Sequence, residues 1–362
     1  MEIDPAENVT RSQSSQPMAG PSQEAPSQRE SSVSSMSTLW PVLGMSGSRD
    51  TFFGRGGLAV QPLSSTQRIP RVYEVWQEIG SSNTRFCCCG RCVTGPKIDF
   101  WYNLCAWFFI LIPSGLYFVL CSDYLWHRGL FPLPILTGIV LLTTIIFLLL
   151  TSCTDPGILP RRRLRALLPG LEEEVSNTLA LPEDLQDCVA DGLTPPTLSD
   201  LRQSQGYKWC STCQVMRPPR CSHCDDCGNC VLTFDHHCPF VNNCIGQRNY
   251  LYFSAFLVST GCLSFSVAVG FGIKLLGYAP SPRGSFTGSP LLIIILLLVG
   301  LPTAVFLLGV IALMMFHIFL LCTGKTTKEV LTGRTVLQGR SLFERPPSLI
   351  HARAQVDTPL DA

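Results

Sequence analysis

One short stretch of the chain combines a cysteine, a histidine and an aspartate that could form a nucleophilic site. Asp235, His236 and Cys238 lie within four residues, in the sequence FDHHCPF. Alternate side chains of an extended segment share a face, so His236 and Cys238 should lie on one side while His237 turns away. A cysteine reacts as its thiolate, and a neighbouring imidazole can take up the thiol proton. We therefore expect Cys238 as nucleophile, His236 as general base and Asp235 as the acid that orients the His236 ring.

Two sets of soft ligands surround this segment and repeat one spacing. In each set the second ligand follows the first by three positions, the third follows after ten more, and the fourth after seven more. The sets are Cys210, Cys213, His223 and Cys230, and then Cys224, Cys227, His237 and Cys244. Such sets hold structural zinc, and a reducing cytosol disfavours disulfides. The spacing therefore predicts two structural Zn²⁺ ions, which would fold a region too small for an apolar core of its own.

Four long apolar stretches must position this cluster. Apolar residues make up 46% of the chain and charged residues only 15%. The stretches are residues 100–121, 130–153, 250–273 and 290–322. At about 1.5 Å per residue each can cross a bilayer core, and Gly300 and Pro302 are expected bend points in the fourth. The sequence predicts an all-α polytopic membrane protein with four transmembrane helices and a small cytosolic two-zinc, cysteine-rich domain between the second and third.

Basic residues predict the orientation of these spans. Lysine and arginine are enriched before the first span, after the second (RRRLR at residues 161–165) and after the fourth, and they are sparser in the other two loops. Both termini and the central loop should therefore face the cytosol. The acidic and polar first residues show no cleavable signal peptide. A net charge of +1 argues against a nucleic-acid partner.

The remaining segments differ in composition. Residues 1–69 are rich in serine, proline and glutamine and should be disordered, as should the end from about residue 353. The other expected segments are a juxtamembrane stretch at residues 70–99, a cytosolic linker at 154–207, the cysteine-rich zinc domain at 208–249 and a cytosolic tail at 323–362.

The residues CSTCQVMRPPRCSHCDDCGNCVLTFDHHCPFVNNCIGQRN resemble the cysteine-rich domain of the DHHC protein S-acyltransferases, also called palmitoyltransferases. Two further family motifs are present, DPG at residues 155–157 and TTKE (TTxE) at residues 326–329. The resemblance spans about residues 73–345 and implies ping-pong transfer from palmitoyl-coenzyme A or another acyl-CoA, through an acyl-enzyme on Cys238, to cysteine of a substrate protein. It also implies contact between Asp235 and either Thr326 or Thr327.

The resemblance carries three finer implications. Leu263 should help to close the acyl cavity, with a preference for palmitoyl chains and some tolerance for stearoyl, or else it only packs between helices or faces lipid. Residues 161–163 and Arg248 could hold coenzyme A phosphates or anchor at lipid headgroups. Residues 73–96 resemble the Ras-palmitoylating branch, which implies Golgi or endoplasmic reticulum membranes, substrates with membrane-proximal cysteines and a small accessory subunit. Alternatively, the cysteines at residues 87–89 are simply membrane-proximal and themselves lipid-modified.

The chain departs from the family pattern at three places. Phe240 replaces the usual tryptophan after DHHCP and removes an indole N–H donor. Cys221 is an extra thiol, expected to be a small buried filler. The segment after TTKE supplies Phe343 but no obvious asparagine, which leaves its docking open.

Other classes of protein compete with an acyltransferase. A catalytically silent membrane zinc scaffold has the same ligand spacing, and labelling of Cys238 would distinguish it. A membrane-anchored RING-like ubiquitin ligase needs a longer gap than that between Cys213 and Cys221, and it leaves Asp235 and His236 without roles. A channel or transporter needs ionisable residues within its spans, where His317 is the only clear one.

Overall fold

The computed structural model describes residues 71–79, 82–168, 170–182, 185, 198–277, 290–333 and 341–351. The expected disordered tail at residues 1–69 and the expected loose end from about residue 353 lie outside the described residues. The chain divides into two units, Met1–Gln67 and Arg68–Ala362, and every described residue belongs to the second unit.

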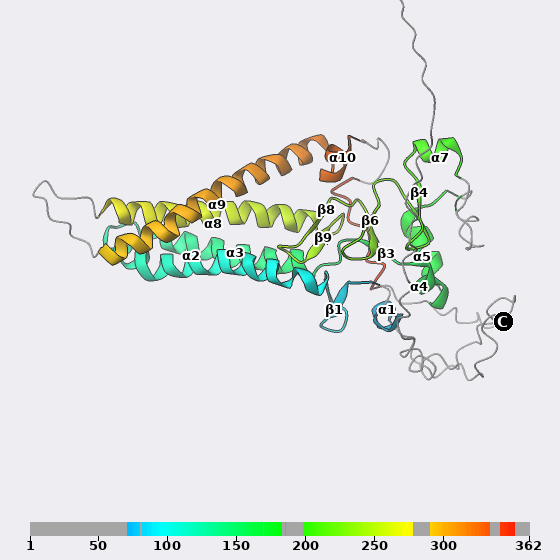
Figure 1. The fold of residues 1–362 in the computed structure, drawn as a ribbon, viewed down its shortest axis with the longest axis horizontal. Coiled ribbons are helices and arrows are strands. Elements are labelled where there is room, and N and C mark those ends of the chain that lie inside the picture. The colour runs from blue at the N-terminus through cyan, green and yellow to red at the C-terminus, as the bar shows by residue number, and fades with distance from the viewer. Residues whose placement is uncertain are drawn as a thin grey trace, which may run out of the picture. The chain divides into compact units, whose positions relative to one another are not determined.

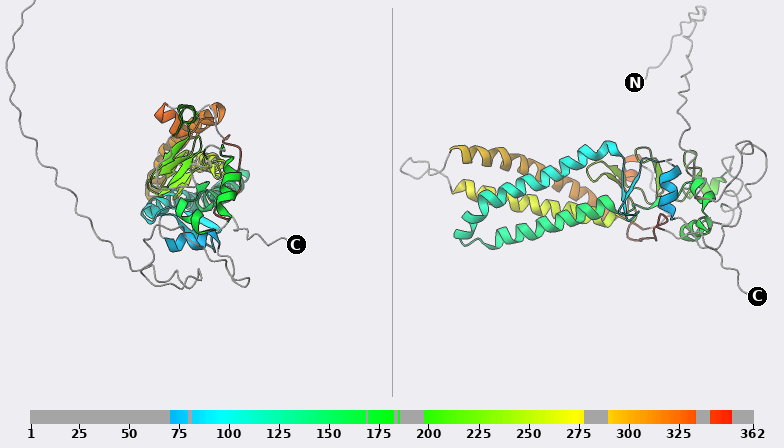
Figure 2. Two further views of the ribbon diagram at one scale, coloured as in Figure 1. Left: turned by 90° about the vertical axis from the view of Figure 1, so that its right-hand side faces the viewer. Right: turned by 90° about the horizontal axis from the view of Figure 1, so that it is seen from below.

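Four helices of the described residues are long and apolar enough to cross a membrane. They are α2 (Phe100–His127), α3 (Pro132–Cys153), α8 (Tyr250–Leu276) and α9 (Pro290–Thr323). The helices lie side by side, as Figure 1 and the right panel of Figure 2 show. Helix α8 packs against each of the other three and is the most buried of the four. The predicted class, four transmembrane helices with a cysteine-rich region between the second and third, is confirmed.

The helix ends differ slightly from the expected ones. Helix α2 continues to His127, beyond the expected end at residue 121, and α3 begins with Pro132 at its first turn. Proline suits that position because the first turn needs no N–H donor and its φ is already helical. Helix α9 stays helical through Gly300 and Pro302 and ends at Thr323.

Short hairpins form the cysteine-rich region at one end of the helices (Figure 1). The pairs are β4 (Lys208–Cys210) with β5 (Val215–Arg217), β6 (Ser222–Cys224) with β7 (Asn229–Val231), and β8 (His236–Cys238) with β9 (Asn243–Ile245). Strand β3 (Ile158–Leu159) adds to β7. His223 lies opposite Cys230, and His237 opposite Cys244. The seven-residue step in the ligand spacing therefore joins two residues that face each other across one hairpin.

Further short elements surround these hairpins. Before α2 come α1 (Val72–Ile79), the antiparallel hairpin of β1 (Arg85–Cys87) and β2 (Cys92–Thr94), and the 3-10 turn η1 (Lys97–Asp99). The others are α4 (Arg162–Leu167), α5 (Leu171–Leu179), α7 (Asp200–Ser204) and α10 (Thr327–Thr332). Residues 341–351 dock on the protein through the buried side chains of Leu342, Leu349 and Ile350. Apolar burial thus docks this segment without the asparagine of the family pattern.

Asn243 joins the hairpins to the end of α3. Its amide Nδ2 donates to the carbonyl oxygens of Thr154 at 2.9 Å, Val93 at 3.1 Å and Ser152 at 3.2 Å. The last carbonyls of a helix have no partner within the helix, so a buried amide at this place satisfies them. Strands β8 and β9 are therefore held directly against the end of a transmembrane helix.

Candidate active site

Both predicted ligand sets come together as compact clusters. Within each set, one ligand atom from every residue lies within 4.8 Å of the others. The Nδ1 atom of His223 is 3.3 Å from the sulfur of Cys213, and that of His237 is 3.4 Å from the sulfur of Cys227. Ligands bound to one tetrahedral Zn²⁺ at its usual bond lengths lie about 3.3–3.8 Å apart. The donor chemistry and spacing therefore fit zinc, and with four protein ligands such sites are structural.

His237 has a partner that the sequence analysis did not identify. Its Nε2 atom lies 2.8 Å from the Oδ2 atom of Asp99, the last residue of η1 before α2. A carboxylate on the outer nitrogen of a metal-binding histidine fixes the tautomer and the ring orientation. The corresponding acid beside His223 is the exposed Asp225, at 3.7 Å. The second cluster is thus linked to the start of the first transmembrane helix. In the sequence, the signal that could have predicted this link is the acid immediately before the first span.

Asp235, His236 and Cys238 lie together beside the second cluster. The Nδ1 atom of His236 is 2.6 Å from the Oδ2 atom of Asp235, whose side chain is buried. His236 and Cys238 lie at alternate positions of the same strand, β8, so their side chains share one face. His237 turns to the zinc ligands instead, as the alternation of an extended strand predicts.

The charges of this group support a reactive thiol. Burial alone lowers the pKa of His236, but its interactions with Asp235 and Cys238 outweigh that effect and raise the pKa to about 9. Burial alone raises the pKa of Asp235, but bonding to His236 and Thr327 reverses this and leaves the pKa below its usual value. An imidazolium held by a carboxylate stabilises a neighbouring thiolate, which is the attacking form of cysteine.

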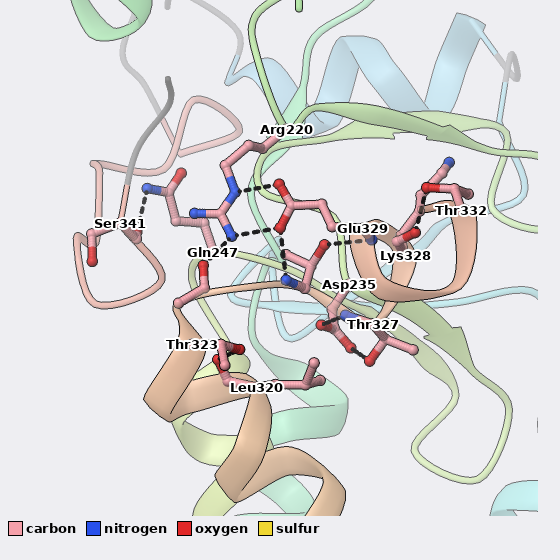
Figure 3. Close-up of polar contacts among 12 residues, drawn as sticks. Arg220, Asp235, Gln247, Leu320, Thr323, Thr327, Lys328, Glu329, Thr332 and Ser341 are labelled. Carbon is pink, nitrogen blue, oxygen red and sulfur yellow. Dashed lines mark hydrogen bonds and ion pairs between the residues drawn. The ribbon is translucent and has the colours of Figure 1, made fainter. Parts of the chain in front are cut away.

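Thr327 completes the environment of Asp235. Its backbone N–H donates to Oδ1 of Asp235 and its hydroxyl to Oδ2, both at 2.7 Å (Figure 3). Of the two threonines expected near Asp235, Thr327 is therefore the one that contacts it. Thr326 is instead the N-cap of α10: its side chain accepts from the backbone N–H of Glu329, and its own N–H donates to the Glu329 carboxylate at 2.8 Å.

The carboxylate of Glu329 also forms an ion pair that sequence reasoning missed. Nε of Arg220 lies 3.0 Å from Oε1 of Glu329, and Nη2 lies 2.9 Å from Oε2 (Figure 3). Both side chains are buried, with 7% and 8% of their surface exposed. Nη2 also donates to the carbonyl of Gly324 at 2.8 Å, just beyond α9. The last transmembrane helix and α10 are thus clamped to the cysteine-rich region.

The DPG motif forms a second buried polar link. Oδ1 of Asp155 accepts from the backbone N–H groups of Gly157 and Ile158 at 2.9 Å, while Oδ2 accepts from the hydroxyl of Ser348 at 2.6 Å. The φ of Gly157 is +106°, a conformation that favours glycine. Arg248 pairs with Asp155 at 3.3 Å and also donates to the carbonyl of Pro346. Its guanidinium is therefore engaged within the protein.

Comparison with known proteins agrees with this geometry. Residues 203–334 match the family model described as DHHC palmitoyltransferase. The chain is 35% identical over 276 residues to probable protein S-acyltransferase 3 of Arabidopsis thaliana, an overlap of 74% of this chain and 63% of that protein. It is 34% identical over 261 residues to human palmitoyltransferase ZDHHC18, covering 71% of this chain and 63% of that protein. It is 33% identical over 286 residues to bovine palmitoyltransferase ZDHHC9, covering 77% of this chain and 74% of that protein.

The chain belongs to the DHHC palmitoyltransferase family. It spans less than two thirds of the Arabidopsis and human relatives just described and about three quarters of the bovine one. Membership in this family of acyltransferases does not favour a RING-like ubiquitin ligase or a silent zinc scaffold. Two residues of this DHHC protein depart from the family pattern within the cysteine-rich region. Cys221 is buried, and Phe240 is half exposed, with its ring edge-on to Tyr102 at 6.1 Å.

This DHHC protein has an apolar cavity of about 200 Å³ between α2, α8 and α9. Leu263 lines it and is 3% exposed, so its side chain faces the interior and not lipid. Phe108 and Pro113 come from α2, and Pro302 and Phe306 come from α9. Cys238 packs against the same apolar cluster that contains Leu263. The cavity is thus lined mostly by apolar side chains from three transmembrane helices.

Proposed function

We propose that the protein transfers a fatty acyl group from an acyl-coenzyme A to cysteine thiols of substrate proteins, through a thioester on Cys238. One observation carries this proposal: Nδ1 of His236 lies 2.6 Å from the buried Asp235 carboxylate, and Cys238 is at the alternate position of the same strand, on the face of His236. Nucleophile, base and orienting acid are the three parts that activated cysteines need. Membership of the DHHC palmitoyltransferase family supports the same reaction.

The first step loads the enzyme. The Cys238 thiolate attacks the carbonyl carbon of the acyl thioester, a new carbon–sulfur bond forms, and the bond to the coenzyme A sulfur breaks. His236, which holds the proton from Cys238, returns it to the departing thiolate. Asp235 keeps the His236 ring in the tautomer that this transfer needs.

The second step unloads it. His236 accepts the proton of the substrate cysteine, whose thiolate attacks the carbonyl carbon of the Cys238 thioester. The Cys238 sulfur leaves and regains the thiolate form beside the protonated His236. The link between Asn243 and the end of α3 supports a position of Cys238 close to the membrane surface, where acylated and acceptor groups meet.

The two Cys3His clusters would hold Zn²⁺ ions that fix the fold and leave no open position for chemistry. The cavity at Leu263 supports a bound acyl chain, and we propose palmitoyl as its preferred length. We propose that residues 161–163 contact coenzyme A phosphates or lipid headgroups, and Arg161 in addition donates to the carbonyl of Gly228.

The cellular setting is a further part of the proposal. We propose that both termini and the zinc domain face the cytosol, because basic residues flank those sides of the spans. The resemblance of residues 73–96 to the Ras-palmitoylating branch supports Golgi or endoplasmic reticulum membranes and a small accessory subunit. Substrates would carry their acceptor cysteines close to the membrane, within reach of Cys238.

The test uses the purified full-length protein and palmitoyl-coenzyme A. We expect a hydroxylamine-sensitive adduct on Cys238 that disappears in Cys238→Ser. Cys322→Ser removes an exposed cysteine near the end of α9 and serves as the matched control, which should keep the adduct. An undiminished adduct in Cys238→Ser would reject the mechanism.

A further inference from the structure

His317 is a buried polar residue of α9 whose role the proposed reaction leaves open. The residue is only 3% exposed, and its Nδ1 atom lies 3.2 Å from the hydroxyl of Tyr250. Tyr250 is the first residue of α8 and is fully buried. The hydroxyl donates to Nδ1 in one tautomer of His317 and accepts from it in the other, so the bond forms in either. This bond joins the two helices beside the candidate active site.

The ring of His317 also lies next to the catalytic candidate His236. The two ring centroids are 6.1 Å apart and the planes are tilted by 48°. Phe253 touches both rings edge-on, at 5.3 Å from His236 and 5.0 Å from His317. Phe253 and His317 thus form a wall against the His236 ring, and Tyr250, about one turn before Phe253 on α8, holds His317 in that wall.

Such a wall supplies what the Asp235 carboxylate alone does not. A single hydrogen bond at Nδ1 fixes one atom of the imidazole but leaves the ring able to swing about that bond. Proton transfer with Cys238 needs the opposite nitrogen directed at the sulfur, within about 0.5 Å and 10–20°. Packing on the ring restricts this swing, and a packing partner with a fixed orientation of its own restricts it most.

We infer that His317 is a positioning residue for acyl transfer: held by the Tyr250 hydroxyl, its ring and that of Phe253 keep the His236 imidazole directed at Cys238. This inference rests on the proposed function of Cys238. It explains why a polar ring is buried at this place in an apolar helix, because an aliphatic side chain would fill the space without a fixed orientation. Loss of either hydrogen-bond partner would also leave a buried polar atom unpaired.

The first part of the test measures single variants of the full-length protein. Two rates are compared, autoacylation with palmitoyl-coenzyme A and alkylation of Cys238 by iodoacetamide, together with zinc content and thermal unfolding. His317→Ala should lower both rates by about tenfold to a hundredfold, as small displacements of catalytic groups do. His317→Phe keeps the ring volume, so both rates should fall less than in His317→Ala. Ser266→Ala removes a partly buried hydrogen bond of α8, away from the candidate site, and should keep both rates.

Two double-mutant cycles then separate positioning from a general structural role. Tyr250→Phe and His317→Phe remove the same hydrogen bond, so the double variant should lose no more activity than the more impaired single variant. In a His236→Ala background, His317→Ala should add no further loss of alkylation rate, because it acts through His236. That rate remains measurable, since a thiol without a base still reacts slowly with iodoacetamide.

Three results would overturn the inference. These are unchanged rates in both His317 variants, an equal loss from His317→Ala with and without His236, or rate losses in His317→Phe that merely follow a loss of zinc or a lower unfolding temperature. Failure of the proposed function has a different signature, because the wild-type protein would then form no acyl adduct on Cys238. The alkylation cycle would still report whether His317 acts through His236.

Discussion

Thr327 donates two hydrogen bonds of 2.7 Å to Asp235, which lies 92 positions earlier in the chain. One comes from its backbone N–H and one from its hydroxyl, so each carboxylate oxygen of Asp235 receives one. The Oδ2 atom is also 2.6 Å from Nδ1 of His236. The TTxE motif after the last transmembrane helix is therefore part of the same site as the DHHC segment (Figure 3).

This relationship predicts the effect of changing Thr327. Thr327→Val keeps the shape and the backbone donor but removes the hydroxyl that holds Oδ2 of Asp235. A hydrogen bond to a charged group contributes about 1.5–3 kcal/mol, so we expect autoacylation to slow by at least about tenfold if that energy serves the transfer. Thr327→Ser restores the hydroxyl and should restore most of the rate. Equal rates for the valine variant and the wild type would show that the backbone bond suffices.

The buried ion pair of Arg220 and Glu329 predicts a loss of stability. Glu329→Ala leaves the Arg220 guanidinium buried without its charged partner, which costs about 3–5 kcal/mol in comparable pairs. We expect a lower unfolding temperature for the full-length protein in detergent. Glu173→Ala removes an exposed acid and should change stability by no more than about 0.5 kcal/mol. A stability loss no larger than that of the control would show that the pair contributes little.

The sequence predicted local features better than distant ones. The spans and the two ligand sets follow from composition and spacing, and the opposite orientations of His236 and His237 follow from strand alternation. The pairs Asp99 with His237 and Arg220 with Glu329 join residues 138 and 109 positions apart. Many acids and bases could pair equally well over such separations, so only the folded chain selects the partners. The continuation of α2 to His127 was not expected, because hydropathy does not distinguish a span from its helical continuation at the membrane surface.

The division of roles between the histidines predicts their zinc content. His223→Ala and His237→Ala each remove a ligand and should release zinc and destabilise the cysteine-rich region. His236→Ala removes the proposed base and should keep near two zinc ions per chain, as the wild type should, while slowing autoacylation strongly. Metal analysis of the purified variants is the measurement. Equal zinc loss in all three would show that His236 also supports a metal.

The outer partner of His237 predicts an asymmetry between the two zinc clusters. Asp99→Asn keeps the size of the side chain but weakens its hold on Nε2 of His237, and comparable changes lower metal affinity by about tenfold to a hundredfold. Asp225→Asn is the matched control, because that acid is exposed and lies 3.7 Å from His223. Zinc release during titration with a chelator should begin earlier in Asp99→Asn only. The same release curve for both variants would show that Asp99 does not strengthen zinc binding.

The last prediction concerns the acyl chain and the cavity wall at Leu263. Leu263→Ala should enlarge the cavity and favour stearoyl over palmitoyl chains, whereas Leu263→Trp should fill it and favour myristoyl chains. A difference of one or two methylenes in an apolar pocket is worth only about 1–3 kcal/mol, so the change should be a graded shift in preference. Autoacylation rates with the three acyl-coenzyme A donors measure it, and Leu276→Ala, at the exposed end of α8, is the matched control. If both Leu263 variants kept the wild-type order of donors with zinc content and folding intact, the acyl chain would have to bind elsewhere than in this cavity.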